Sequence, residues 1–254
     1  MQRCFAGHAR FILIPLLAAI GLPGLAASPQ TQASTPAIQT GLSPELRGDL
    51  AMARQQYLAA IEAYRQAPSD SAQIWNKLGL AYHHLFAIDE AQRDYQRALR
   101  IRPDYPEALN NLGAVYYAKG SFHRAEKYYL RAIHLDARSA ATYSNLGTAY
   151  FAQRKTDKGL AAYRTAFAID PHVFEDAAPQ LVTESLPARQ RAQQDYCLAL
   201  VFAQSGHSDR AIDYLRRALN EGFDDRKKIL DDRTLASIRA LPAFAQLMAE
   251  QKAR

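Results

Sequence analysis

The sequence predicts an all-α fold, a right-handed superhelix (α-solenoid) of stacked helix pairs with short capping helices at its C-terminal end. Two observations lead to this prediction: residue types recur every 34 positions in the middle of the chain, and apolar residues inside each interval follow helical spacing. Helices this short are unstable alone, so each unit has to bury its apolar face against its neighbours. The recurring columns are Leu78, Leu112 and Leu146; Gly79, Gly113 and Gly147; Tyr82, Tyr116 and Tyr150; Tyr95, Tyr129 and Tyr163; and Ala98, Ala132 and Ala166.

Residues 1–26 have the features of a secretory signal peptide. Arg3 and Arg10 precede the apolar run 11–20, and small residues lead up to Ala26, after which a signal peptidase can cut. The apolar run is shorter than the ~20 residues that span a bilayer. We therefore expect an exported protein, in the periplasm or secreted, with no membrane span after cleavage. A signal that is retained as an anchor is the alternative.

Residues 27–42 are expected to form a flexible linker. They are rich in Ser, Thr, Gln and Pro and carry no charge, so they cannot bury enough apolar surface to offset the entropy lost on ordering. Regular structure is expected to begin at Ser43, which can cap a helix, and Pro44, which suits the first helical position. A degenerate helix pair is therefore predicted at 43–71.

Three complete units are predicted at 72–105, 106–139 and 140–173. In each unit the first helix carries packing residues at i, i+3, i+4 and i+7, and the second carries them at i, i+4 and i+7. Pro103 and Pro171 are expected to follow the second helices, because proline cannot continue a helix. In the first complete unit the packing residues are Trp75, Leu78, Gly79 and Tyr82, then Ala91, Tyr95 and Ala98.

The register breaks after the third complete unit. Residues 174–191 contain Pro179 and Pro187 with several acidic residues, which indicates a loop insert. Residues 192–254 then fit a further degenerate unit, followed by short helices that would cap the open end of the stack.

The succession of Trp, Leu-Gly, Tyr, a turn glycine, Ala, an aromatic residue, Ala and Pro resembles the tetratricopeptide repeat. The resemblance covers roughly residues 43–254 and implies a protein-interaction module whose first helices line a concave groove. Four positions depart from the pattern: Phe86 and Arg154 replace the turn glycine, Ala137 replaces the proline, and Gly159 stands where alanine is usual. A glycine inside a helix costs ~1 kcal/mol, so Gly159 is expected to weaken the third unit.

Side chains that point away from the packing stripe of the first helices are expected to line the groove. An asparagine amide both donates and accepts hydrogen bonds, so a ladder of them can pair with the backbone of an extended peptide. Asn111 and Asn145 are one repeat apart and suggest such a ladder; the alternative is that they bridge or cap helices locally. The expected groove residues are Asn76, Lys77, Leu80, His83, Asn110, Asn111, Tyr117, Asn145, Thr148 and Phe151.

A clamp for a C-terminal carboxylate, which some similar proteins build, is not expected. The resemblance places Lys and Arg of that clamp at the positions of Ala141 and Asn145, and an Asn at the position of Leu80. Only Asn111 matches an element of the clamp.

Composition and motifs argue against catalysis and against nucleic acid. The 254 residues are 48% apolar with a net charge of +6, which describes a core-forming protein with a small basic surplus. No zinc-protease, phosphate-loop or nucleophile-elbow motif is present, and the histidines are adjacent or isolated, so no enzyme activity, metal or cofactor is expected. In the unit 106–139 five basic residues oppose three acidic ones, which is not a basic stripe. Cleavage would remove Cys4 and leave Cys197, which we expect to be buried.

The leading interpretation is a non-catalytic scaffold or adaptor of the cell envelope that binds a protein or peptide segment in the groove. The alternative is a structural subunit of an envelope assembly or secretion complex that acts through its convex or terminal surfaces. A hydrolase with an unrecognised site is the least favoured. Neither the identity of the partner nor the oligomeric state follows from the sequence.

Overall fold

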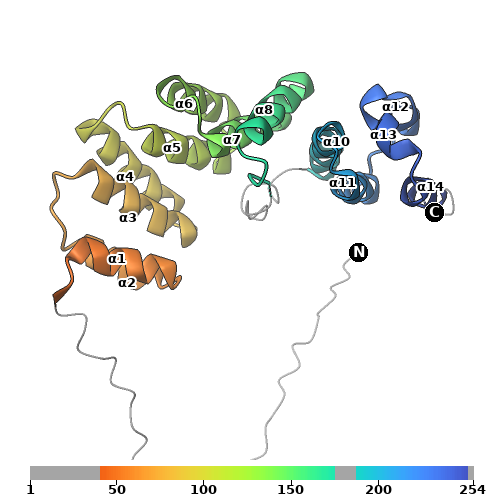
Figure 1. Cartoon of the computed structure of the whole chain (residues 1–254). Coiled ribbons are helices and arrows are strands. Elements are labelled where there is room, and N and C mark those ends of the chain that lie inside the picture. The colour runs from red at the N-terminus through yellow and green to blue at the C-terminus, as the bar shows by residue number, and fades with distance from the viewer. Residues whose placement is uncertain (1–40, 175–186, 251–254) are drawn as a thin grey trace, which may run out of the picture. The chain divides into compact units, whose positions relative to one another are not determined.

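The structure, a computed structural model, describes residues 41–174 and 187–250 (Figure 1). The described residues are helical and contain no strand, which confirms the predicted all-α class. Helix pairs follow one another along the chain, and the two helices of each pair pack together. The expected signal peptide, nearly all of the expected linker and most of the expected loop insert lie outside the described residues.

Within the described ranges the chain forms five helix pairs and a group of short C-terminal helices. Each first helix also contacts the second helix of the pair before it, so successive pairs stack. The pairs are α1 (Pro44–Ala53) with α2 (Tyr57–Tyr64), α3 (Ala72–His84) with α4 (Ile88–Ile101), α5 (Pro106–Ala118) with α6 (Phe122–Leu135), α7 (Ala140–Ala152) with α8 (Thr156–Ile169), and α10 (Ala188–Gln204) with α11 (Ser208–Asn220). The short helices are α12 (Arg226–Asp231), a 3-10 turn (Arg233–Leu235), α13 (Ala236–Arg239) and α14 (Pro242–Glu250).

The helix ends agree with the signals in the sequence. Ser43 caps α1 by accepting a hydrogen bond from the backbone N–H of Leu46 at 3.2 Å, and Pro44 is the first helical residue. The helices α4 and α8 end two residues before Pro103 and Pro171. The first pair is shorter than the others because α2 has 8 residues, whereas α4, α6 and α8 have 14 each.

The recurring glycines let a tyrosine ring lie directly against a helix backbone. A Cβ atom on Gly113 would lie 2.6 Å from a ring carbon of Tyr129, closer than real Cβ contacts allow. The fifth pair has Ala199 and Leu215 at the equivalent positions, both fully buried. A second-helix side chain smaller than tyrosine therefore leaves room for a methyl group on the first helix. The same close approach joins Gly48 to Tyr64, Gly79 to Tyr95, and Gly147 to Tyr163.

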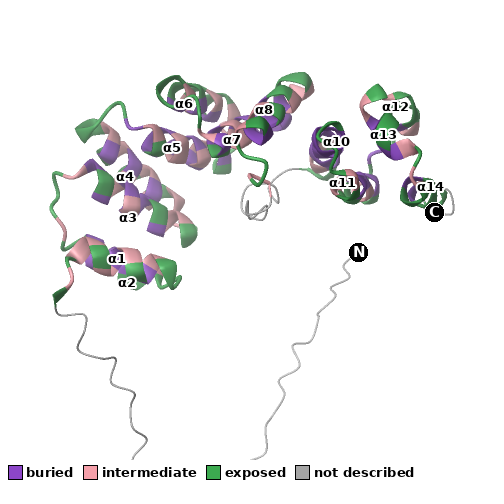
Figure 2. Cartoon of the chain, viewed as in Figure 1, coloured by how far each residue is buried: buried purple, intermediate pink, exposed green. Residues whose placement is uncertain are grey.

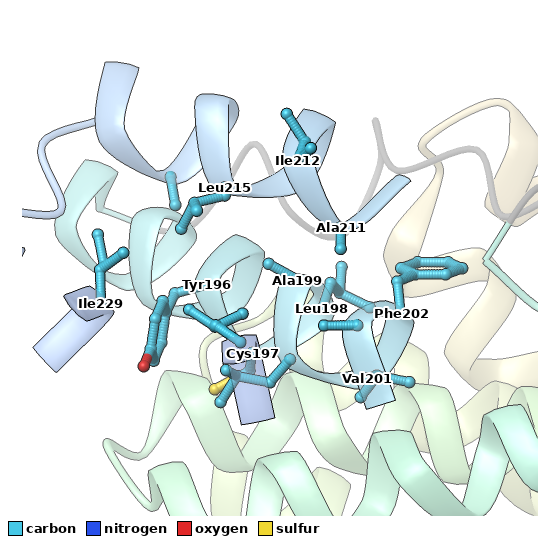
Figure 3. Packing of buried hydrophobic residues seen from close by; sticks show 14 of the residues in the cluster. Tyr196, Cys197, Leu198, Ala199, Val201, Phe202, Ala211, Ile212, Leu215 and Ile229 are labelled. Carbon is cyan, nitrogen blue, oxygen red and sulfur yellow. The ribbon is translucent and has the colours of Figure 1, made fainter. Parts of the chain in front are cut away.

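The fifth pair continues the hydrophobic core of the fourth. Helix α10 begins at Ala188, inside the range 174–191 that the sequence assigns to a loop, and most of it is buried (Figure 2). Its Phe202 meets Phe167 of α8 edge to face, with ring centroids 5.4 Å apart. Burial raises the pKa of Cys197 to about 11, so its thiol is protonated and enclosed, as expected (Figure 3).

The C-terminal helices close over α10 and α11, which confirms the predicted capping helices. They contribute buried apolar residues to the same core. Tyr196 of α10 stacks on Phe223 with ring centroids 4.4 Å apart and donates a hydrogen bond to Asp232 at 2.7 Å. The contributed residues are Ile229, Leu235, Ile238, Phe244 and Leu247.

Candidate functional site

The candidate site lies on the first helices of the three central pairs, α3, α5 and α7. Adjacent first helices contact each other, so side chains at equivalent positions form rows that cross from one pair to the next. Two neighbouring positions in each helix, three and two residues before the recurring glycine, carry polar side chains. We call these residues the ladder; they are Asn76, Lys77, Asn110, Asn111, Ser144 and Asn145.

The asparagines of the ladder bond to one another across the helices. The side-chain N–H of Asn111 donates to the side-chain oxygen of Asn76 at 3.0 Å, and Asn145 donates to Asn110 in the same way at 3.0 Å. The amides therefore do bridge neighbouring helices, which was the alternative interpretation of the sequence. Each bridge uses one donor and one acceptor, and an asparagine amide has two donors and two lone-pair sites. Bridged amides can therefore still bind a ligand.

Lys77 occupies the position equivalent to Asn111 and Asn145, and it reaches back to the first helix pair. Its ammonium lies 2.7 Å from a carboxylate oxygen of Glu45 and 2.7 Å from Asp49, which also accepts a hydrogen bond from Tyr64 at 2.8 Å. Burial alone would lower the pKa of Lys77, but the hydrogen bonds to Asp49 and Glu45 raise it. Lys77 thus anchors α1 to α3, and its charge is neutralised.

Four of the ten expected groove residues are buried, so the expectation that these four line a groove is wrong; the first three are Tyr117, Thr148 and Phe151. Tyr117 and Phe151 are each 2% exposed, and the buried hydroxyl of Thr148 bonds to that of Tyr163 at 2.9 Å. All three lie at the part of the first helix that the following pair covers: α7 covers Tyr117, and α10 contacts both α7 and α8. Asn76 is also buried, and only its bridge to Asn111 connects it to the surface row.

Gly159 makes room for the ring of Phe151. A Cβ atom on Gly159 would lie 2.7 Å from that ring, which itself packs edge to face on Tyr163 with centroids 5.1 Å apart. The departure from alanine that the sequence shows at this position therefore has a steric reason. The packing of Phe151 offsets part of the cost of a glycine within α8.

Six of the expected residues remain partly accessible: Lys77, Leu80, His83, Asn110, Asn111 and Asn145. Burial, with His84 beside it, holds the pKa of His83 below its usual value, so its imidazole is neutral at pH 7. With Lys77 paired, this accessible row is polar but uncharged. Such a surface suits neutral hydrogen-bonding partners such as a peptide backbone, and it lacks the cations that a phosphate backbone requires.

Leu80, like Ala114 in the next pair, lacks a hydrogen-bonding side chain at a position where two other pairs have one. It lies directly after the recurring glycine, where Asp49 and Thr148 each bond to the buried tyrosine hydroxyl of their own pair. A leucine cannot do so, and the buried hydroxyl of Tyr95 has no hydrogen-bond partner in the structure. An exposed apolar residue that leaves a buried hydroxyl unpaired is a candidate for a binding role.

The described residues offer no arrangement for metal chemistry and no membrane-length helix. No group of three or more His, Cys, Asp and Glu side chains gathers in residues 41–174 or 187–250. Over the same ranges, no helix combines the length and the apolar content that crossing a bilayer requires.

Family models identify the central repeats. A model for the TPR repeat matches residues 87–120, and models for the tetratricopeptide repeat match residues 106–138 and 140–173. The segment 87–173 therefore consists of tetratricopeptide repeats, as the 34-residue period indicates. No curated protein matches the sequence.

Several solved structures are similar to this chain. A crystal structure of MamA is 22% identical over 68% of this chain and 93% of its own, with a TM-score of 0.47. A crystal structure of YrrB, described as a TPR protein with an unusual peptide-binding site, is 18% identical over 72% of this chain and 86% of its own, with a TM-score of 0.47. The first TPR of Spaghetti (RPAP3), bound to the HSP90 peptide SRMEEVD, is 26% identical over 43% of this chain and 86% of its own, with a TM-score of 0.41.

Proposed function

We propose that this protein is a non-catalytic interaction scaffold that binds an extended segment of a partner protein along α3, α5 and α7. The observation that carries the proposal is the set of partly accessible amides of Asn110, Asn111 and Asn145, which are held in place by the asparagine bridges between successive repeats. Neighbouring helices lie about 8–10 Å apart, and an extended chain advances about 3.3 Å per residue. A bound segment would therefore meet an amide at about every third residue.

The bridges fix these amides before a ligand arrives. An asparagine held by a neighbouring helix loses less side-chain freedom on binding than a free one, which favours affinity. The uncharged character of the row predicts that binding there depends little on salt, because salt screens interactions between charges. Leu80 would supply an apolar contact at the α3 end of the row.

Affinity capture tests the proposal. Chain 27–254 is immobilised, and the proteins that it recovers from a cell-envelope extract are compared with those recovered by Asn111→Ala and Asn145→Ala together. We expect the double variant to recover at least about tenfold less of the partner than the wild-type chain does. The reason is that each bridged amide contributes about 0.5–1.5 kcal/mol to the free energy of binding. The recovery by the wild-type chain should change less than about twofold between low and physiological salt.

Arg131→Ala serves as the matched control, because Arg131 is exposed on the second helix α6 and lies outside the ladder. Thermal unfolding of every variant separates lost binding from lost folding. Equal recovery by the double variant and the wild type would overturn the proposal.

We further propose that the protein is exported, as the succession of charged, apolar and small residues in 1–26 supports. The expected result is a mature chain that begins at Ala27 and is recovered from the periplasm or the medium. Amino-terminal sequencing of the purified native protein checks this. A mature chain that still begins at Met1 in the cytoplasmic fraction would contradict it.

A further inference from the structure

The turns that join the helices of each pair share one backbone conformation. Each has a residue with positive φ two residues before the second helix begins, a conformation that favours glycine. Two of the five are glycine, and at both of them a Cβ atom would meet nothing within 4 Å. The residues, with their φ angles, are Gln55 (57°), Phe86 (58°), Gly120 (70°), Arg154 (60°) and Gly206 (80°).

Phe86 is the least expected of these residues. A bulky side chain is rare at positive φ and strains the backbone, and strain of this kind gathers at functional sites. Its ring packs into no core, because Phe86 is 67% exposed. Folding alone therefore gives no reason for a phenylalanine at this turn. Glycine would relieve the backbone strain, and an arginine or glutamine side chain would interact better with water.

Phe86, Leu58 and Leu85 are exposed apolar residues, and with Tyr57 and His84 they form what we call the apolar patch. Tyr57 of α2 and His84 of α3 stack with ring centroids 4.7 Å apart and an interplanar angle of 3°, which brings the two pairs together at this edge. The next residues in sequence, Leu58 and Leu85, are 68% and 37% exposed. Exposed apolar residues scattered singly need no explanation, whereas a group on one edge marks an interaction site.

The equivalent place one pair further along is polar. There Asp89 of α4 and Lys119, which directly follows α5, occupy the positions of Leu58 and Leu85, and they form an ion pair at 2.5 Å. The apolar patch thus replaces an ion pair that the same backbone geometry supports elsewhere in the chain. Apolar side chains are not a requirement of this position.

Cations predominate along the same edge. We call the turns of the first four pairs, with the first four residues of each following helix, the turn edge. Its charged residues are Arg54, Lys119, Arg124, Arg154, Lys155 and Lys158 against Asp89, Glu90 and Asp157. Arg54, Arg124 and Arg154 are exposed and take part in none of the ion pairs found among the described residues. Between two of these turns lies an open hollow of about 650 Å³, lined by His123, Arg124 and Gln153 among others.

We propose that the turn edge is a second docking surface, which takes an acidic protein segment with an apolar side chain that rests on Phe86 and Leu58. The excess of cations over carboxylates on this edge favours an acidic segment over any neutral or basic one, since oppositely charged surfaces attract. The exposed aromatic ring supplies the kind of anchor that dominates binding at interfaces. This surface lies on the turns, apart from the ladder on the first helices, and does not depend on it.

Phe86→Gly tests the proposal because folding and docking respond to it in opposite directions. Glycine relieves the strain at positive φ, so Tm should rise by about 2–4 °C, while the loss of the ring should weaken docking. Gln55→Gly is the matched control, since it makes the same backbone change at the equivalent turn and removes no apolar side chain. The probe is a short fluorescein-labelled peptide in which glutamates alternate with leucine and phenylalanine.

We expect the peptide to bind the full chain, to bind Phe86→Gly at least about tenfold more weakly, and to bind Gln55→Gly within about twofold of wild type. A peptide with serine in place of its apolar residues should bind as weakly to wild type as the original does to Phe86→Gly. Raising the salt concentration should weaken the binding of the acidic peptide to the wild-type protein. Equal affinity of Phe86→Gly and Gln55→Gly would overturn the proposal. The proposal would also be overturned if a peptide with lysines in place of the glutamates bound more strongly. The same holds if the protein bound phosphatidylglycerol vesicles in a Phe86-dependent way but did not bind the peptide.

Discussion

Replacing Gly113 by alanine is expected to lower the free energy of unfolding by about 1–2 kcal/mol. The new methyl group would lie 2.6 Å from one ring carbon of Tyr129 and 2.8 Å from another, and this ring is 1% exposed and cannot move into solvent. Overpacking of this kind costs about 1–3 kcal/mol or more, and the better helix propensity of alanine returns at most about 1 kcal/mol. Urea unfolding followed by circular dichroism measures the change.

The fifth helix pair supplies the compensating substitution. Ala199 and Leu215 stand where Gly113 and Tyr129 stand, so Tyr129→Leu should accommodate the methyl group of Gly113→Ala. The double variant is expected to be at least about 1 kcal/mol more stable than the sum of the two single effects predicts. Strictly additive effects would show that the glycine is not there to admit the ring.

Phe202→Ala is expected to lower the free energy of unfolding by about 3–5 kcal/mol, the usual range for truncating a buried phenylalanine to alanine. Phe202 is 1% exposed and meets Phe167 of α8 as well as Tyr214 of α11, whose ring stacks on it at 5.2 Å. Because the contact with Phe167 joins the fourth and fifth pairs, its loss should also uncouple the two pairs. We expect unfolding in two steps, with the helices from α10 onward losing protection from hydrogen exchange first.

Phe86→Ala is the control, because it removes the same ring from an exposed position. Its effect should stay within about 0.5 kcal/mol, the usual range for surface substitutions. If Phe202→Ala lowered the free energy of unfolding by no more than Phe86→Ala does, the packing of the fifth pair on the fourth would be contradicted.

The repeat architecture could be predicted because its physical causes are local and periodic. A column of glycines facing a column of tyrosines sixteen residues later leaves a signal at a constant interval, and Ser43, Pro103 and Pro171 mark helix ends through their own backbone chemistry. The start of α10 was harder to place. Prolines and acidic residues around Pro187 indicate a loop, and the helix begins immediately after that proline.

The candidate site could be predicted only in part, because exposure depends on which pair covers which part of a helix. Leu80, His83, Asn110, Asn111 and Asn145 remain accessible, whereas Tyr117, Thr148 and Phe151 share the same helix face and are covered by the pair that follows. The insert hid the continuation of the stack, so the sequence alone did not reveal that α10 covers α7. The partner of Asn111 is Asn76, 35 residues away and not 34, because neighbouring helices are offset.

At the turn edge, by contrast, the sequence pointed to residues of interest because they depart from the repeat pattern. Phe86 and Arg154 stand out in the sequence as replacements for a turn glycine, and the structure keeps the glycine-like backbone at both positions. The residue type changed while the conformation did not. That combination cannot be seen in the sequence, because the conformation of the turn has to be known first.

Site-specific photocrosslinking tests the central claim, that a protein segment binds along the first helices. A benzophenone amino acid is placed in turn at Leu80 and Ala114, on α3 and α5, and at Leu130 and Leu135, which are exposed on the second helix α6. Irradiation in the presence of the captured partner should yield adducts from Leu80 and Ala114 and none from Leu130 or Leu135. Adducts from the α6 positions alone would contradict the account.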